Sequence, residues 1–389
     1  MKNLVYILPD KDGGVASVVR NLLRFRTNRC KAKVVLIHNT MDDPLLRVQD
    51  EFNADEIIRI NYNGKWSSKQ GVMNKIKRHL DNNSILISND GGIELEVVNN
   101  LNFTIPVVYI MHGDYDHYFN CINEQGHLID TIITVSDYLM EKIESNFENK
   151  DTFSKIDVVS VKFPVPLTID NDKEKVRAKI IRVAFVGALI EDKGVLLFKN
   201  ILTQLTELKI NFIFNIIGAG PLEEKLMKEL QSFSNVNFKG KLTNQEVISL
   251  HSEHDILILP SYGEGLPVSI VEAMKCGVIP IATNLKSGIP ELIEDGVTGY
   301  TVPLDEIEKY GKFIKYLDNN RDEMAVISHK CISKAESMFK PYIQTKAYED
   351  VFINTKPHAF MKTKNYNLMN FLPFTLANRI NNLKNIYGK

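Results

Sequence analysis

Long apolar runs are missing from this sequence. No stretch reaches the roughly 18 consecutive apolar residues of a membrane-spanning helix, so we expect no such span. The N-terminal segment MKNLVYILPDKDGG holds an apolar stretch that ends at Pro9 and Asp10, and it is too short for a signal peptide. Internal repeats and low-complexity segments are also lacking. Together these absences predict a globular, cytoplasmic protein.

A bias of charge is missing as well. The 47 Lys and Arg residues nearly balance the 48 Asp and Glu residues, so the whole chain offers no case for binding nucleic acid. Cysteine is scarce, and the four scattered residues show neither a CxxC pair nor Cys/His metal spacing. We expect reduced thiols at all four positions, which are Cys30, Cys121, Cys276 and Cys331.

What the chain does have is an alternation of short apolar runs and amphipathic stretches. This pattern is typical of parallel sheets covered by helices, and 389 residues suffice for two such domains. In the first half we predict strands at 4–8, 33–37, 84–88, 106–110 and 131–135. In the second half we predict them at 182–187, 210–218, 255–259 and 278–282, and we predict helices at 15–25 and 221–233.

A change of composition separates the two halves. Residues 161–179 hold two prolines followed by a charge cluster, which indicates an interdomain linker. We therefore predict an N-terminal domain at 1–165, a C-terminal domain at 166–350 and a tail at 351–389. Both domains are expected to be doubly wound α/β units, with ligand bound at the carboxyl ends of their strands.

The most informative segment runs from Pro260 to Gly299. It places Glu264 in a glycine-flanked loop and Glu272 about two turns into the helix that follows, with seven residues between the two carboxylates. A helix N-terminus suits a phosphate, whereas carboxylates beside a diphosphate are tolerated only if they bind hydroxyl groups. The pattern indicates a ligand with polyols on both sides of a diphosphate, as in a nucleotide-sugar.

In its Gly/Pro frame this segment resembles the retaining glycosyltransferases of family four, which have the two-domain GT-B fold. Six further pieces resemble elements of that family in the family's order: DKDGGVASVVRNL (10–22), MHGD (111–114), TVSDYL (134–139), FVGALIEDKG (185–194), FNIIGAGPLEEKL (214–226) and VNFKGKLTNQEV (236–247). The resemblance reaches to about residue 350. It implies two Rossmann-like domains facing each other across a cleft, with a C-terminal helix able to cross back to the N-terminal domain. It also implies that the domain at 1–165 binds the acceptor and that the domain at 166–350 binds the nucleotide-sugar.

The resemblance assigns roles to both carboxylates. Glu272 corresponds to the family's second Glu, which accepts hydrogen bonds from a ribose diol. Glu264 corresponds to the first Glu, which accepts them from the sugar, and the N–H groups of Gly265 and Leu266 are candidate contacts to sugar or phosphate. The alternatives are a solvated surface glutamate and an ordinary turn. Pro267 is expected in the first turn of the helix.

Lys193 follows a predicted strand, where a cation can stabilise a departing diphosphate. The alternative is a surface lysine. After Gly187, where the family usually has Arg, this chain has Ala188. Another cation can substitute, and Arg20 and Lys241 are candidates; otherwise donor affinity is reduced.

Two further elements are implied in the N-terminal half. Gly13 and Gly14 open the first helix and can bring N–H groups to a phosphate, although such glycines also serve packing. His112 follows a strand, at the place where a His of the family touches the donor sugar; a structural His is the alternative. In the C-terminal half, Phe238, Lys239 and Gly240 match the loop whose backbone reads the nucleobase. Because recognition by the backbone leaves little trace in the side chains, the sequence does not distinguish a UDP donor from a GDP donor.

The tail differs from the rest of the chain. Lys356–Lys389 contains six Lys or Arg residues, no Asp or Glu, and interleaved aromatic residues. Such a segment can lie on an anionic membrane surface, on the inner face in a cytoplasmic protein. It can equally form a closing helix that packs on the N-terminal domain, and the two are compatible.

The sequence thus predicts a retaining hexosyltransferase of cell-surface polysaccharide synthesis. It would move a sugar from a UDP or GDP donor to a glycan or lipid-linked acceptor. No DxD-type motif stands at a strand end, and the family needs no metal, so we expect neither a metal nor a cofactor. Two alternatives stay open: a catalytically silent GT-B binding subunit, which Ala188 favours, and another activity on a nucleotide-sugar, such as epimerisation. We expect no nucleic-acid partner.

Overall fold

A computed structural model describes residues 1–49, 52–147, 153–166, 180–357 and 368–387, and the chain divides into two compact units. Unit 1 comprises Met1–Val161 and Thr345–Lys389, and unit 2 comprises Lys162–Gln344. The domain boundaries drawn from the sequence, at residues 165 and 350, lie a few residues beyond these division points. Most of the predicted linker, residues 167–179, lies outside the described residues.

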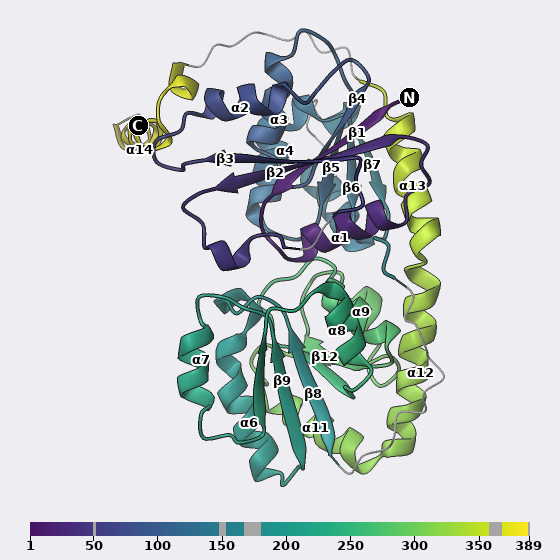
Figure 1. The fold of residues 1–389 in the computed structure, drawn as a ribbon. Coiled ribbons are helices and arrows are strands. Elements are labelled where there is room, and N and C mark those ends of the chain that lie inside the picture. The colour runs from purple at the N-terminus through teal and green to yellow at the C-terminus, as the bar shows by residue number, and fades with distance from the viewer. Residues whose placement is uncertain (50–51, 148–152, 167–179, 358–367, 388–389) are drawn as a thin grey trace. The chain divides into compact units, whose positions relative to one another are not determined.

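Unit 1 is built on a parallel sheet with the strand order β3-β2-β1-β4-β5-β6-β7 (Figure 1). Its strands are β1 (Asn3–Pro9), β2 (Lys31–Asn39), β3 (Glu56–Tyr62), β4 (Ser84–Ser88), β5 (Val107–Met111), β6 (Thr131–Thr134) and β7 (Asp157–Ser160). Every residue of β4, β5 and β6 is buried, which explains their nearly unbroken apolar sequences. The five strands predicted for this half are confirmed.

The sequence did not predict the two edge strands, β3 and β7. In β3 only Ile60 is buried, and in β7 no residue is fully buried. A strand at the edge of a sheet has fewer neighbours to bury its side chains, so its sequence lacks the apolar run that marks a central strand.

The helices between the strands of unit 1 are α1 (Gly14–Arg24), α2 (Lys69–Lys77), α3 (Ile93–Glu96), α4 (Asp116–Gln125) and α5 (Asp137–Phe147). Helix α14 (Phe374–Tyr387) belongs to the tail of unit 1. Short 3₁₀ turns occur at η1 (Pro44–Leu46), η2 (Val97–Asn100), η3 (Gly126–Leu128), η4 (Phe153–Lys155) and η7 (Leu368–Phe371). Helix α1 is amphipathic as predicted, with buried residues at Val18, Val19, Leu22 and Leu23.

The chain returns to unit 1 through helix α13 (Pro341–Asn354) (Figure 1). Its Glu349 carboxylate accepts a hydrogen bond from the backbone N–H of Thr27 at 2.9 Å and pairs with Arg29 at 3.1 Å. Phe352 is fully buried, and its ring meets the edge of Tyr6 on β1 at a centroid distance of 5.9 Å. The helix that was expected to cross back to the N-terminal domain is therefore present.

Unit 2 is built on a second parallel sheet, with the order β10-β9-β8-β11-β12-β13. Its strands are β8 (Ile181–Val186), β9 (Phe212–Ile217), β10 (Val236–Gly240), β11 (Ile256–Leu259), β12 (Ile279–Thr283) and β13 (Tyr300–Val302). This is the strand order of a Rossmann domain, in which the first strand lies centrally and the order reverses beside it. The prediction of two doubly wound α/β units is confirmed.

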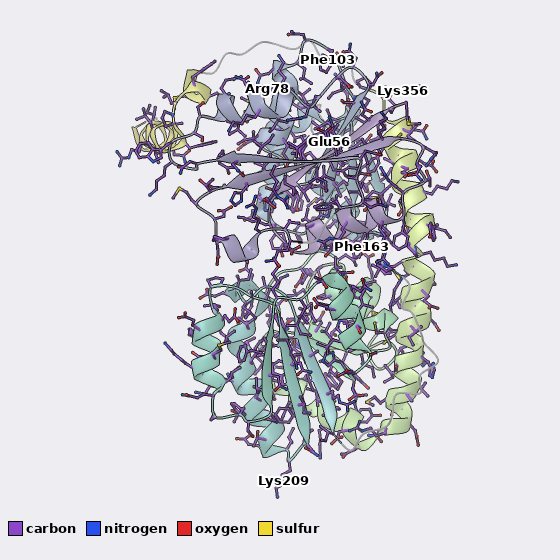
Figure 2. All side chains as sticks on the ribbon, in the orientation of Figure 1. Glu56, Arg78, Phe103, Phe163, Lys209 and Lys356 are labelled. Carbon is purple, nitrogen blue, oxygen red and sulfur yellow. The ribbon has the colours of Figure 1, made fainter. Side chains whose placement is uncertain are left out.

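The helices of unit 2 are α6 (Phe198–Glu207), α7 (Glu223–Leu230), α8 (Asn244–His251), α9 (Val268–Lys275), α10 (Ile289–Leu292), α11 (Glu308–Asn319) and α12 (Arg321–Met338), with 3₁₀ turns η5 (Glu191–Lys193) and η6 (Val195–Leu197). Helix α9 is unusual because all residues from Ile270 to Lys275 are buried. Lys275 donates hydrogen bonds to the carbonyls of Val165 at 2.6 Å and Phe339 at 2.7 Å. Beside these carbonyls Phe163, labelled in Figure 2, packs its ring on that of Phe339.

Two features bear on the expectations about membranes and thiols. None of the helices within the described ranges combines the length and the apolar character that crossing a bilayer requires. All four cysteines are free thiols.

Candidate active site

The carboxyl ends of the unit 2 strands bring several predicted site residues together. Backbone hydrogen bonds join the loops that leave neighbouring strands: Gly187 donates to Ile217 at 3.1 Å, and Gly218 donates to Gly240 at 2.8 Å. Tyr262, after β11, donates to the carbonyl of Asp192, after β8, at 2.8 Å. These loops therefore form one connected rim at the edge of the sheet where ligands bind in open α/β folds.

Gly194 allows two of these loops to touch. Its φ of +65° is left-handed, and a Cβ atom at this position would lie 1.8 Å from the carbonyl oxygen of Pro260. Glycine is therefore required both by the backbone conformation and by the space available. The contact fixes Lys193, directly before it, against the loop that carries Glu264.

Lys193 and Glu264 form the centre of this rim. The Lys193 ammonium lies 2.7 Å from Glu264 Oε1, and the Ser261 hydroxyl donates to the same oxygen at 2.7 Å. The Glu264 side chain is only 6% exposed, and that of Lys193 is 21% exposed. In the part of the chain that the structure describes, no group donates to Glu264 Oε2. Glu264 thus has one oxygen held in place and the other able to accept from a ligand hydroxyl.

The backbone after Glu264 offers free donors. Neither the N–H of Gly265 nor that of Leu266 donates a hydrogen bond to any described residue. Pro267 is the N-cap of α9 rather than a residue of its first turn, and its extended backbone delays the start of the helix. Glu272 is consequently the fifth residue of α9, little more than one turn from its start, and not two turns as predicted.

Glu272 is buried rather than solvated. The residue is only 5% exposed, so it is not an ordinary surface glutamate. Oε1 accepts a hydrogen bond from the side-chain amide of Asn244, the first residue of α8. Since α8 starts with a complete capping box between Thr243 and Glu246, Asn244 is held firmly beside the carboxylate.

The residues expected to read the nucleobase lie on a strand rather than in a loop. Phe238, Lys239 and Gly240 end the edge strand β10, where Lys239 is exposed and Phe238 half-buried. The sequence contains no apolar run here because alternate residues face solvent. Their part in binding a base stays a prediction.

Gly13 and Gly14 begin helix α1 of unit 1, as predicted. Gly13 is its N-cap, with a φ of +150° that side-chain-bearing residues rarely adopt. A Cβ atom at Gly13 would meet nothing within 4 Å, so the glycine leaves the helix start open and not packed. Arg20, a candidate to replace the missing family Arg at Ala188, is instead paired with Asp12 at 3.1 Å.

His112 follows β5 of unit 1 and is oriented by a buried asparagine. Its Nε2 lies 3.0 Å from Oδ1 of Asn89, while the Asn89 amide donates to the backbone carbonyls of Ile7 at 3.0 Å and Ile87 at 3.4 Å. Because the amide is committed to these carbonyls, Oδ1 must accept, and His112 must carry its proton on Nε2. Its buried Nδ1 has no partner among the described residues and is left as an acceptor.

Burial lowers the pKa of His112 to about 3, because the cation is poorly solvated there, while the charge of Asp90 partly opposes the shift. The unfolded chain takes up this proton near its ordinary pKa of about 6.5, whereas the folded chain does not. We therefore expect the free energy of unfolding to decrease as the pH falls from about 6.5 toward 3.

Nitrogen NMR on histidine-labelled protein should show His112 as the neutral Nε2–H form at every pH from about 5 to 8. In Asn89→Asp, the new carboxylate should raise the pKa of His112. A neutral Nδ1–H form in the unchanged protein would contradict the assignment.

The sequence did not predict three residues that contact the candidate site side chains: Ser261, Asn244 and Asn89. Ser261 lies three residues before Glu264 in the same loop, a spacing that could have been noticed. Asn244 and Asn89 lie 28 and 23 residues from their partners, and no local pattern connects them. Within the described residues, no three His, Cys, Asp or Glu side chains are grouped to hold a metal ion; metal independence stays a prediction.

Comparison with known proteins locates a family match in the second half of the chain. Residues 168–337 match the family model described as glycosyl transferases group 1. The chain is 30% identical over 179 residues to WcaL of Escherichia coli K12, provisionally named a colanic acid biosynthesis glycosyltransferase. That alignment covers 43% of this chain and 44% of WcaL, so the chain spans less than half the length of this relative.

Solved structures match over nearly the whole chain. A structure of HepE from Anabaena in complex with UDP and glucose has a TM-score of 0.73 at 17% identity, covering 91% of this chain and all of that one. The pneumococcal O-GlcNAc transferase GtfA, in complex with UDP and GlcNAc, also gives 0.73, at 14% identity, covering 91% of this chain and 99% of that one. The chain therefore has the GT-B fold, and its residues 168–337 match the glycosyl transferases of group 1.

Proposed function

We propose that the protein is a retaining glycosyltransferase of family four. It transfers a hexose from a nucleoside-diphosphate donor to a glycan or lipid-linked acceptor in cell-surface polysaccharide synthesis, without a metal ion. The observation that carries the proposal is the contact of Lys193 with the buried Glu264 at the rim of the unit 2 sheet. The names of the relatives and the nucleotides in the matching structures support the same class of reaction and favour UDP.

Each group has a role in the proposed reaction. Glu272 binds the ribose diol, and Glu264 binds sugar hydroxyls through its second oxygen. Lys193, the N–H groups of Gly265 and Leu266 and the start of α9 stabilise the diphosphate as it gains charge. In unit 1, Gly13 and Gly14 offer N–H groups to a phosphate, and His112 Nδ1 accepts from a sugar hydroxyl. Phe238, Lys239, Gly240 and Gly187 line the nucleotide.

The bond between the sugar C1 and the diphosphate oxygen breaks as the acceptor oxygen bonds to C1 on the same face. The acceptor's proton passes to the departing diphosphate, so configuration is retained and no protein base is needed. Glu264 is poorly suited to act as a general base, because Lys193 and Ser261 both donate hydrogen bonds to its Oε1.

The first test is thermal unfolding with UDP, GDP, ADP and their sugars. A ligand that binds only the folded chain adds roughly 2.7 kcal/mol of stability at a hundredfold excess over its Kd. We expect one nucleotide to raise Tm, and the rise to vanish in Glu272→Ala. Glu224→Ala, at an exposed position of α7, is the control and should keep the full shift.

A second assay separates the transferase from a silent binding subunit, which Ala188 favours. A transferase with bound donor should release nucleoside diphosphate from the sugar nucleotide, slowly without acceptor, and Glu264→Gln should abolish this release. Binding without any turnover would establish the silent subunit, and a changed sugar on an intact nucleotide would establish epimerisation. The anomeric configuration of the product, measured by NMR, tests retention.

A further inference from the structure

Two segments far apart in the sequence form one surface of unit 1. Ser68 and Pro373 are paired in an antiparallel bridge, and the N–H of Phe374 donates to the carbonyl of Ser67 at 3.0 Å. The Thr375 hydroxyl donates to the carbonyl of Lys65, also at 3.0 Å. The tail thus returns to the loop that precedes α2, and Figure 1 shows α14 on the side of unit 1 where α2 and β3 lie.

Large apolar side chains are exposed where these segments meet. Trp66 is 75% exposed, Phe371 is 52% exposed and Leu376 is 45% exposed. Single exposed apolar residues are common, but three on touching segments indicate a surface that contacts something other than water. We call the surface made by Lys65, Trp66, Phe371, Leu376 and Arg379 the Trp66 face.

The two segments that form the Trp66 face carry only positive charges. Residues 57–80 contain six Lys or Arg and no Asp or Glu, and residues 368–387 contain two Lys or Arg and no Asp or Glu, in a chain that is nearly neutral overall. Lys65 and Arg379 are exposed, as are Lys75 and Arg78 at the far part of α2 (Figure 2 labels Arg78). Among the described residues none of these four forms an ion pair.

We propose that the Trp66 face docks on an anionic lipid bilayer. Trp and Phe prefer the interface between head groups and acyl chains, and nearby cations are attracted by the negative surface. Each cation increases partitioning roughly fivefold, so binding through this face is reversible. The proposal names a surface of unit 1 and does not depend on the proposed transfer reaction.

The protein carries its own probe for this interaction, because Trp66 is its single tryptophan. Vesicles of phosphatidylglycerol should shift the emission of the full-length protein to shorter wavelength, and brominated lipids should quench it. Vesicles of phosphatidylcholine should do neither, and added salt should reverse the effect by screening. Unchanged emission with phosphatidylglycerol vesicles would overturn the proposal.

Vesicle sedimentation tests the same face by substitution. The double variant Lys65→Glu/Arg379→Glu should partition at least roughly 25-fold less onto phosphatidylglycerol vesicles, at unchanged Tm. The control Lys199→Glu/Lys228→Glu, at exposed lysines of unit 2, makes the same change of net charge and should keep most of the binding. Equal losses of vesicle binding in both variants would show that the vesicles attract the chain through its overall charge, and would refute docking through the Trp66 face.

Two other partners for the Trp66 face, a soluble glycan and a second copy of the chain, can be distinguished from a bilayer by simple measurements. A blue shift produced by soluble polysaccharide without vesicles would identify a glycan-binding face instead. A dimer in sedimentation equilibrium that Trp66→Ser dissociates would identify a contact between two copies. Either result in the absence of lipid binding overturns the proposal.

Discussion

Replacing Lys193 by Met is expected to reduce kcat for sugar transfer by about 10²- to 10³-fold, with a smaller change in donor KM. The ammonium is held by the buried Glu264 carboxylate at the rim of the sheet, where charge on the departing diphosphate would develop. A preorganised cation acts most strongly on the state with the most negative charge, so its loss mainly reduces the rate. Steady-state kinetics with the donor identified by thermal shift measures both constants.

Lys228→Met is the matched control for this variant. Lys228 is an exposed lysine on α7 of the same unit, so the substitution removes the same charge away from the rim. Its kcat should equal that of the unchanged protein, and Lys193→Arg should recover part of the loss. If Lys193→Met raises KM while leaving kcat intact, Lys193 serves binding alone and the proposed electrostatic role is wrong.

Gly194→Ala should destabilise unit 2 by about 3–5 kcal/mol, because the substitution combines a steric clash with a left-handed backbone. The new Cβ would stand 1.8 Å from the carbonyl oxygen of Pro260, so the Lys193 loop and the Glu264 loop would have to separate. A loss of this size corresponds to a decrease in Tm of roughly 10 °C. Calorimetry measures it, and turnover should decrease as well because Lys193 no longer meets Glu264.

Gly296→Ala distinguishes the clash from the backbone effect. Gly296 also has a left-handed φ, +72°, but a Cβ there would meet nothing within 4 Å. Gly296→Ala should therefore lower the free energy of unfolding by only about 1–2 kcal/mol, which is the cost of placing a side-chain-bearing residue in the left-handed conformation. Equal destabilisation of the two variants would mean that the contact between Gly194 and Pro260 contributes little.

The sequence predicted those elements whose burial leaves a continuous apolar pattern. Strands such as β4 and β5 are buried along their whole length and were located within about a residue. The edge strands β3 and β10 were missed because alternate side chains face solvent. The start of α9 was placed too early, since a proline fits both the N-cap and the first turn.

The candidate site was predictable in its residues but not in its contacts. Lys193 and Glu264 were both identified from local patterns, yet their contact joins positions 71 residues apart. The amide partners Asn244 and Asn89 were not identified at all, because an asparagine in a loop or at a helix start is common in any fold. Only the folding of strands side by side brings them to Glu272 and His112.

The return of α13 to unit 1 has a consequence for how the chain is made. Unit 1 needs Thr345 and the residues after it, but residues 162–344 leave the ribosome first. At roughly 5–20 residues per second this delay is on the order of ten to forty seconds. During translation, therefore, the surface of unit 1 that Glu349 and Phe352 later cover stays open, while unit 2 is already complete. We expect the second unit in the sequence to finish folding before the first.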